Sequence, residues 1–102
     1  MLEPMPKGYI IAHVSVEDAE RYAQYAMRAA QAQALFGARV LVRAGRYEIL
    51  EGQARSRNVI LEFPTYEQAR GYFHSPEYQA ARQFRIDAAI ADIMVIEGVD
   101  ED

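Results

Sequence analysis

Two histidines and one strand glutamate are the residues of this chain best suited to move protons near neutral pH. His74 directly precedes Ser75-Pro76, a pair typical of a helix start. An imidazole there can act as a general acid or base, or can brace the helix junction through a hydrogen bond. Glu62 lies in an apolar run, where an unpaired carboxylate is costly, so it needs a cationic partner. We predict His74 and Glu62 as the catalytic candidates.

Arginines and one tyrosine are the candidates for holding a substrate. Arg43 and Arg39 lie on the strand expected beside Glu62, and either can pair with that carboxylate or grip an anionic group with two parallel hydrogen bonds. Tyr47 offers a phenolic donor for an enol or carbonyl oxygen, and can equally be an interface aromatic. His13, at the end of the first predicted strand, is a further binding candidate or a residue of the rim.

Composition excludes several classes of protein. The chain has 102 residues and a net charge of −4, from 11 Lys and Arg against 15 Asp and Glu, with 51% hydrophobic residues. This is the composition of a single globular domain, predicted over residues 1–102, and not of a disordered tail or a basic nucleic-acid binder. No apolar run is long enough to cross a bilayer. We expect a soluble, cytoplasmic protein with no nucleic-acid or membrane partner.

Cofactor and metal motifs are missing from the sequence. The chain has no cysteine, so disulfides, thiolate zinc sites and cysteine nucleophiles are excluded. The two histidines are far apart and show no metal-ligand spacing. The glycines form no phosphate-binding loop, and Ser75 has no nucleophile-elbow context. The sequence therefore predicts neither a metal nor a cofactor.

Hydrophobic periodicity predicts the order β-α-β-β-α-β. The expected strands span residues 9–14, 39–43, 58–63 and 93–96, with the second continuing over 46–50 after a bend or bulge. Ser15 is the expected cap of a helix reaching residue 36, Thr65 caps the next helix, and Ser75 caps a third that reaches about residue 89. This order predicts a ferredoxin-like α+β fold, a four-stranded antiparallel sheet with its helices on one face.

The two faces of the predicted sheet differ in polarity. Because side chains alternate along a strand, the purely apolar registers belong to the helix side. The other face then carries an apolar set mixed with ionisable groups: Tyr9, Ile11, His13, Arg39, Leu41, Arg43, Ile60, Glu62, Met94 and Ile96. Such a face is too apolar for water and too charged for a plain core. It predicts a homodimer in which two sheets enclose a cavity lined by arginine, glutamate, histidine and tyrosine.

Four stretches resemble the domain of unknown function 1330 family. They are KGY at 7–9, GARVLVR at 37–43, GRYEILEG at 45–52 and FHSPEY at 73–78, within a match from about residue 7 to 98. The resemblance implies the dimeric α+β barrel superfamily, whose members pair their sheets. Relatives there are similar to muconolactone isomerases, antibiotic-biosynthesis monooxygenases and chlorite dismutases. For the family itself the resemblance implies no particular reaction.

Three functional hypotheses follow. The first is a cofactor-independent enzyme or binding protein for a small anionic or carbonyl compound held in the dimer cavity. The second is a non-catalytic dimerising module, in which the charges only fix register and partner choice. The third, implied by the distant relatives alone, is a haem- or oxygen-dependent enzyme.

Overall fold

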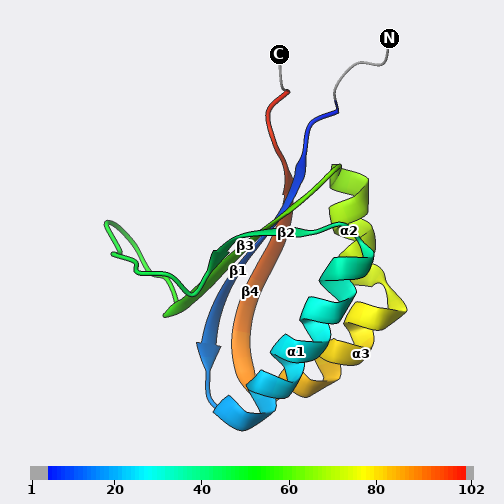
Figure 1. Cartoon of the computed structure of the whole chain (residues 1–102). Helices are drawn as coiled ribbons and strands as arrows, with labels where there is room; N and C mark the ends of the chain where they lie inside the picture. Colours follow the sequence, from blue (N-terminus) through cyan, green and yellow to red (C-terminus); the bar gives the residue numbers. More distant parts are fainter. Residues whose placement is uncertain (1–4, 101–102) are drawn as a thin grey trace.

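A computed structural model describes residues 5–100 of the chain. The elements are β1 (Gly8–Val16), α1 (Ala19–Leu35), β2 (Arg39–Arg43), β3 (Arg57–Phe63), α2 (Tyr66–His74), α3 (Pro76–Arg85) and β4 (Ala89–Glu97) (Figure 1). None of the helices in the described part of the chain is long and apolar enough to cross a membrane.

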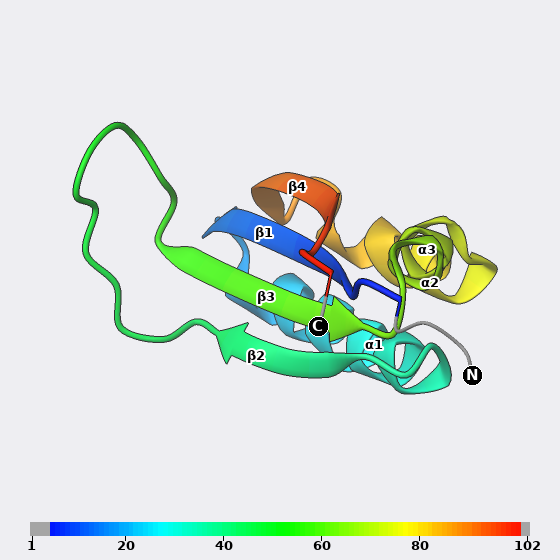
Figure 2. The same cartoon turned by 90° about the horizontal axis from the view of Figure 1, so that it is seen from above.

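The four strands form one antiparallel sheet in the order β2-β3-β1-β4. The helices α1, α2 and α3 lie along the same side of this sheet, and no helix or strand of residues 5–100 covers the opposite side (Figures 1 and 2). We call the uncovered side the open face. The predicted ferredoxin-like α+β fold is therefore confirmed.

The second crossover is built from two helices joined at a single residue. Ser75 ends α2 and begins α3: its hydroxyl accepts from the Tyr78 amide at 3.1 Å and donates to the Tyr72 carbonyl at 2.7 Å. Pro76 occupies the first turn of α3, where its missing N–H costs nothing. This confirms the predicted helix start and fixes the angle at which Tyr72 and Tyr78 enter the core.

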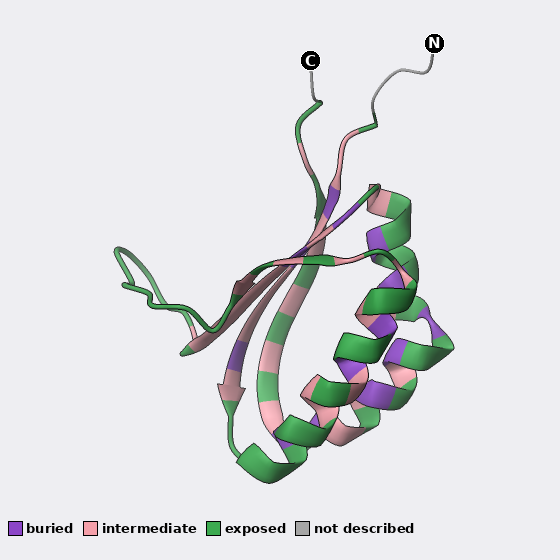
Figure 3. Ribbon diagram, in the orientation of Figure 1, coloured by how far each residue is buried: buried purple, intermediate pink, exposed green. Residues whose placement is uncertain are grey.

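The core lies between the helices and one register of each strand (Figure 3). Ile10, Leu61 and Phe63 are buried from the sheet, and Tyr72 and Tyr78 are buried from the helices. The purely apolar registers of β1 and β3 therefore face the helices, as the alternation predicts.

The first helix begins later than the sequence predicts. Pairing of β1 with β4 continues as far as Val16, which lies opposite Ala89, so Ser15 is still part of the strand. The N-cap is Asp18, whose carboxylate accepts from the Arg21 amide at 3.1 Å. Ser15 as a cap was wrong because strand pairing outweighs a local capping pattern.

The predicted continuation of the second strand is also wrong. The chain leaves the sheet at Ala44, which has a left-handed φ of 52°, and residues 44–56 form a long loop (Figure 2). The irregularity in pairing lies earlier, between Val40 and Val42. Val40 is opposite Leu61 but Val42 is opposite Ile60, so Leu41 is an extra, bulged residue.

Candidate functional site

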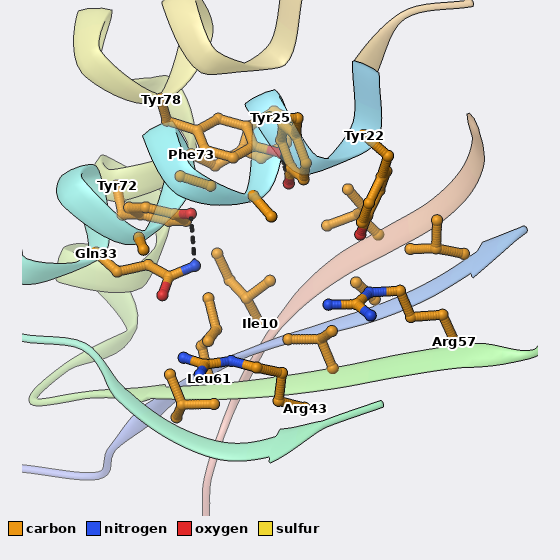
Figure 4. A pocket seen from close by; sticks show the side chains of 18 of the residues that line it. Ile10, Tyr22, Tyr25, Gln33, Arg43, Arg57, Leu61, Tyr72, Phe73 and Tyr78 are labelled. Atoms are coloured by element: carbon orange, nitrogen blue, oxygen red, sulfur yellow. Dashed lines mark hydrogen bonds between the residues drawn. The ribbon is translucent and has the colours of Figure 1, made fainter. Parts of the chain in front are cut away.

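A cavity of about 310 Å³ lies between the sheet and the helices (Figure 4). Its volume is at the lower end of the range of roughly 300–1,000 Å³ typical of small-molecule sites. Aliphatic side chains of β1 and β3 form one wall, among them Ile10, Val59 and Leu61, and α1 supplies small residues such as Ala26 and Ala29. We call this space the sheet–helix cavity.

The bulge in β2 places Arg43 on the wall of this cavity. A regular strand would put Arg43 on the open face with Arg39 and Leu41, as the alternation predicts. The extra residue instead sets Arg43 opposite Val59, and both border the sheet–helix cavity. The predicted face of Arg43 is therefore wrong, because a one-residue shift exchanges the two faces of a strand. Arg43 is exposed as well as lining the cavity, so it lies at the opening.

Arg57, at the start of β3, is the second cation of the cavity wall. Its Nε is buried and has no hydrogen-bond partner, and its guanidinium carbon lies 5.2 Å from the centre of the Tyr22 ring. No aspartate or glutamate lines the cavity, and within residues 5–100 neither Arg43 nor Arg57 forms an ion pair. The cavity therefore carries two positive charges without a counter-ion, in a chain of net charge −4.

Phenolic hydroxyls form the polar part of the opposite wall. Tyr25 of α1 and Tyr78 of α3 have their hydroxyl oxygens 2.9 Å apart, and Gln33 Nε2 donates to the Tyr72 hydroxyl at 3.4 Å. Burial raises the pKa of Tyr25 and of Tyr72 well above the ordinary value for tyrosine. These tyrosines therefore stay protonated and serve as neutral hydrogen-bond donors.

Glu62 and Arg39 lie on the open face, away from this cavity. They are opposite each other across the β2–β3 pair, as predicted, with Tyr9 opposite Glu62 on β1. The Tyr9 hydroxyl donates to Glu62 Oε2 at 3.2 Å, whereas the ion pair within the described residues joins Arg55 to Asp92. The expected arginine partner of Glu62 is thus replaced by a tyrosine.

His13 also lies on the open face, at the root of the 44–56 loop. Its Nδ1 is 2.6 Å from Asn58 Oδ1, and Asn58 in turn donates to the Arg55 carbonyl at 3.1 Å. Because an amide oxygen only accepts, Nδ1 carries the proton in this contact. Through this hydrogen bond His13 connects β1 to the C-terminal end of the 44–56 loop.

His74 and Tyr47 lie at two further places. His74 is exposed at the C-terminal end of α2 and borders a separate hollow of about 190 Å³ with Arg70 and Met94. Tyr47 is half-exposed on the 44–56 loop, off any strand. The structure does not bring His74 together with Glu62, since the first belongs to the helix layer and the second to the open face.

The tyrosines of the helix wall were not predicted as site residues. Tyr22 and Tyr72 lie among apolar residues on the buried sides of α1 and α2, so their sequence context is that of core residues. The sequence feature that could have indicated them is the number of tyrosines among these apolar residues, because a buried tyrosine hydroxyl requires a hydrogen-bond partner that a purely apolar core does not offer. In the described part of the chain, no three potential metal ligands lie together.

A family model supplies the decisive comparison. The model of the domain of unknown function DUF1330 matches residues 7–99. The chain belongs to the DUF1330 family. No curated protein has a sequence that matches that of this DUF1330 chain.

Solved structures share the fold of the DUF1330 chain at low sequence identity. A protein of unknown function from Rhodopseudomonas palustris has a TM-score of 0.73 at 16% identity, over 97% of this chain and 87% of that one. SnoaB, a cofactor-independent oxygenase from Streptomyces nogalater, has a TM-score of 0.59 at 8% identity, over 94% and 96%. A dimeric protein of ferredoxin-like fold from Bacteroides fragilis has a TM-score of 0.53 at 14% identity, over 89% and 95%. At such identities the likeness establishes the fold alone.

Proposed function

We propose that this DUF1330 protein binds a small organic anion with an apolar body in the sheet–helix cavity. The observation that carries the proposal is the pair Arg43 and Arg57, two cations on an apolar cavity wall that no carboxylate lines. Taking a guanidinium out of water is costly unless its donors are satisfied. A carboxylate or enolate entering the cavity satisfies both, and the aliphatic wall accommodates the rest of the molecule.

The charge distribution supports an anion over a neutral ligand. The chain as a whole is acidic, so positive charge at this cavity does not follow from composition. Arg57 presents a buried Nε–H with no acceptor among residues 5–100. The terminal nitrogens of the Arg57 guanidinium can hold a carboxylate through two parallel hydrogen bonds, a geometry that lysine cannot provide.

In this proposal Arg43 binds the anion, as the sequence predicts, but on the helix side of the sheet and not on the open face. The cavity lining includes no histidine or carboxylate. A reaction in it therefore starts from a substrate that is already ionised, or uses a base from elsewhere. Binding is the proposed function. Cofactor-independent catalysis, which SnoaB performs as an oxygenase, would be an addition to it.

The open face fits a second copy of the chain. It exposes Leu41, Ile90, Met94 and Ile96, each with 43–51% of its surface accessible, beside the Tyr9–Glu62 pair. Half-exposed aliphatic side chains on both edge strands of an uncovered sheet face are typical of an interface. We propose a homodimer through this face, which leaves the sheet–helix cavity of each protomer free. The non-catalytic dimerising module is the alternative if that cavity takes no ligand.

Titration calorimetry with a panel of small carboxylates, each paired with its neutral amide, tests the anion site. We expect carboxylates to bind and amides to bind at least about 10-fold more weakly, the size of a hydrogen bond to a charged group. Arg57→Met should lower carboxylate affinity by about 10- to 100-fold, and Arg43→Met by about 3- to 10-fold because Arg43 is more exposed.

The matched control is Arg46→Met, which removes an exposed guanidinium from the 44–56 loop. It should leave carboxylate affinity unchanged. Equal binding of acids and amides, or equal losses in all three variants, would contradict the proposal. Absence of binding by every carboxylate in the panel would favour the dimerising module.

A further inference from the structure

Tyr25 and Tyr78 present more hydrogen-bond donors than they use. Their two hydroxyls contain two hydrogens, and the 2.9 Å contact between the oxygens uses one. The other neighbour of the pair, Arg85 Nη2, is itself a donor and lies 3.5 Å from the Tyr78 hydroxyl oxygen, so it cannot accept the remaining phenolic hydrogen. One phenolic hydrogen of the pair is therefore without an acceptor in residues 5–100.

The groups in contact with the pair include a guanidinium and an aromatic ring, neither of which accepts the spare phenolic hydrogen in a hydrogen bond within residues 5–100. Arg85 is 8% exposed, its guanidinium carbon lies 5.5 Å from the Tyr25 ring centre, and its Nε is buried without a partner. Phe73 packs against Tyr78 at 5.0 Å between ring centres. A phenolic donor without a protein acceptor is available to an oxygen atom of a ligand in the cavity.

The pair lies on the opposite wall of the sheet–helix cavity from the two cavity arginines. Tyr25 and Tyr78 come from α1 and α3, whereas Arg43 and Arg57 come from the sheet (Figure 4). Both groups border the same space of about 310 Å³. A ligand that spans the cavity meets guanidinium groups at one side and a phenolic donor at the other.

We infer that the Tyr25–Tyr78 pair recognises a second oxygen on the bound anion, and that the ligand class is an organic acid with a carbonyl or ionised hydroxyl oxygen remote from its carboxylate. This inference rests on the proposed anion site. The charge of Arg85 beside the pair strengthens the phenolic donor, and burial raises the pKa of Tyr25, which keeps the Tyr25 hydroxyl protonated. The Tyr25–Tyr78 pair would determine which organic acids are preferred, whereas Arg43 and Arg57 would bind the carboxylate that all of them share.

Two probes of the same shape isolate this contact. In 4-acetylbenzoate and 4-isopropenylbenzoate the carboxylate and ring are identical, and an acceptor C=O in the first is replaced by C=CH₂ in the second. We expect the wild-type protein to prefer the acetyl compound by about 5- to 10-fold, the effect of one buried hydrogen bond. No preference in the wild-type protein would overturn the inference.

The variant that removes the donor must change both residues. Either single Phe substitution leaves one phenolic hydrogen, because the mutual hydrogen bond is lost as well. The double variant Tyr25→Phe/Tyr78→Phe leaves none, and its preference should fall to about 1-fold while it still binds both probes. Tyr66→Phe, in α2 outside the cavity lining, is the control and should keep the preference. A double variant that keeps the preference would overturn the inference.

An infrared measurement on the wild-type protein gives the same answer if the double variant does not fold. The C=O stretching band of the bound, ¹³C-labelled acetyl probe should lie at lower wavenumber than that of the same probe in an aprotic solvent, because a hydrogen bond weakens the C=O bond. An unshifted band in the bound probe would overturn the inference. Failure of both probes to bind would instead contradict the anion site itself, so the two failures are distinguishable.

Discussion

Arg43 and Val59 lie directly opposite each other across the β2–β3 pair, and both border the sheet–helix cavity. The bulge at Leu41 produces this register, since it gives β2 one residue more than β3 over the same length. A basic side chain that would otherwise belong to the open face thereby becomes part of the cavity wall. The face on which Arg43 lies therefore depends on one extra residue in β2.

Exchanging Arg43 with its neighbour tests that register without altering composition. In the double variant Val42→Arg/Arg43→Val, the guanidinium lies opposite Ile60, on the open face. We expect carboxylate affinity to fall by about 3- to 10-fold, as for Arg43→Met, because the charge has left the cavity. Calorimetry of the exchange variant beside Arg43→Val makes the comparison. Recovery of affinity in the exchange variant would show that the face occupied by the arginine does not matter.

The sheet could be predicted from the sequence because its core registers are unambiguous. Leu61 and Phe63 alternate with Ile60 and Glu62, so only one assignment of faces buries the larger apolar set. The same reasoning correctly placed Tyr9, His13 and Arg39 on the open face, as their register positions confirm.

The position of Arg43 could not be predicted in this way. Val40 and Val42 are both apolar, so the pattern of β2 fits a regular strand and a bulged strand equally well. Pairing with β3, a long-range contact, decides between them. The sheet–helix cavity was missed for a related reason, because its volume depends on how closely the helices approach the sheet, which periodicity does not specify.

Gly8 is required where β1 passes the start of α2. A Cβ at this position would overlap the Thr65 carbonyl oxygen and lie 2.6 Å from Tyr66 Cα. Gly8→Ala should lower the free energy of unfolding by about 1–3 kcal/mol, since backbone on both sides must move. Chemical denaturation of the wild-type protein and of Gly8→Ala measures this difference in the free energy of unfolding. The matched control is Gly71→Ala in α2, where the added Cβ meets no atom outside the local backbone of the helix within 4 Å and a gain of about 0.5–1 kcal/mol is expected. A neutral Gly8→Ala would show that this approach is looser than described.

The stability of the protein should decrease in alkaline solution. The pKa of Tyr25 is raised by burial from its ordinary value of 10.0, so above that pH the unfolded chain releases a proton that the folded chain retains. The unfolded state then binds fewer protons, and the free energy of unfolding falls as pH rises through this range. Below pH about 10, Tyr25 is protonated in both the folded and the unfolded chain, so no stability is lost through its ionisation.

Denaturation of the wild-type protein and Tyr25→Phe across pH about 8 to about 11 measures this effect. The variant has no hydroxyl to ionise at this position, so its free energy of unfolding should depend less steeply on alkaline pH. Parallel curves for the two proteins would contradict the buried, protonated state of Tyr25.

Met94 tests the open face as a dimer interface. It is 51% exposed in the single chain and lies opposite Ile11, midway along the edge strand β4. Light scattering of the wild-type protein should give twice the 11.6 kDa chain mass. Met94→Asp should raise the dissociation constant about 100-fold or more, because it buries a charge in each copy. Leu35→Asp, at the end of α1 and 69% exposed, is the control and should remain dimeric. A wild-type monomer would contradict the proposed interface.

The arginine Nε–Hε resonances of the protein, followed by nuclear magnetic resonance during titration with a small carboxylate, test the central claim most directly. The account predicts that the signals of Arg57 and Arg43 shift together, with one dissociation constant, while that of Arg39 on the open face stays in place. Shifts confined to Arg39 and to the amides of Tyr9 and Met94 would place the anion on the other side of the sheet and contradict the account.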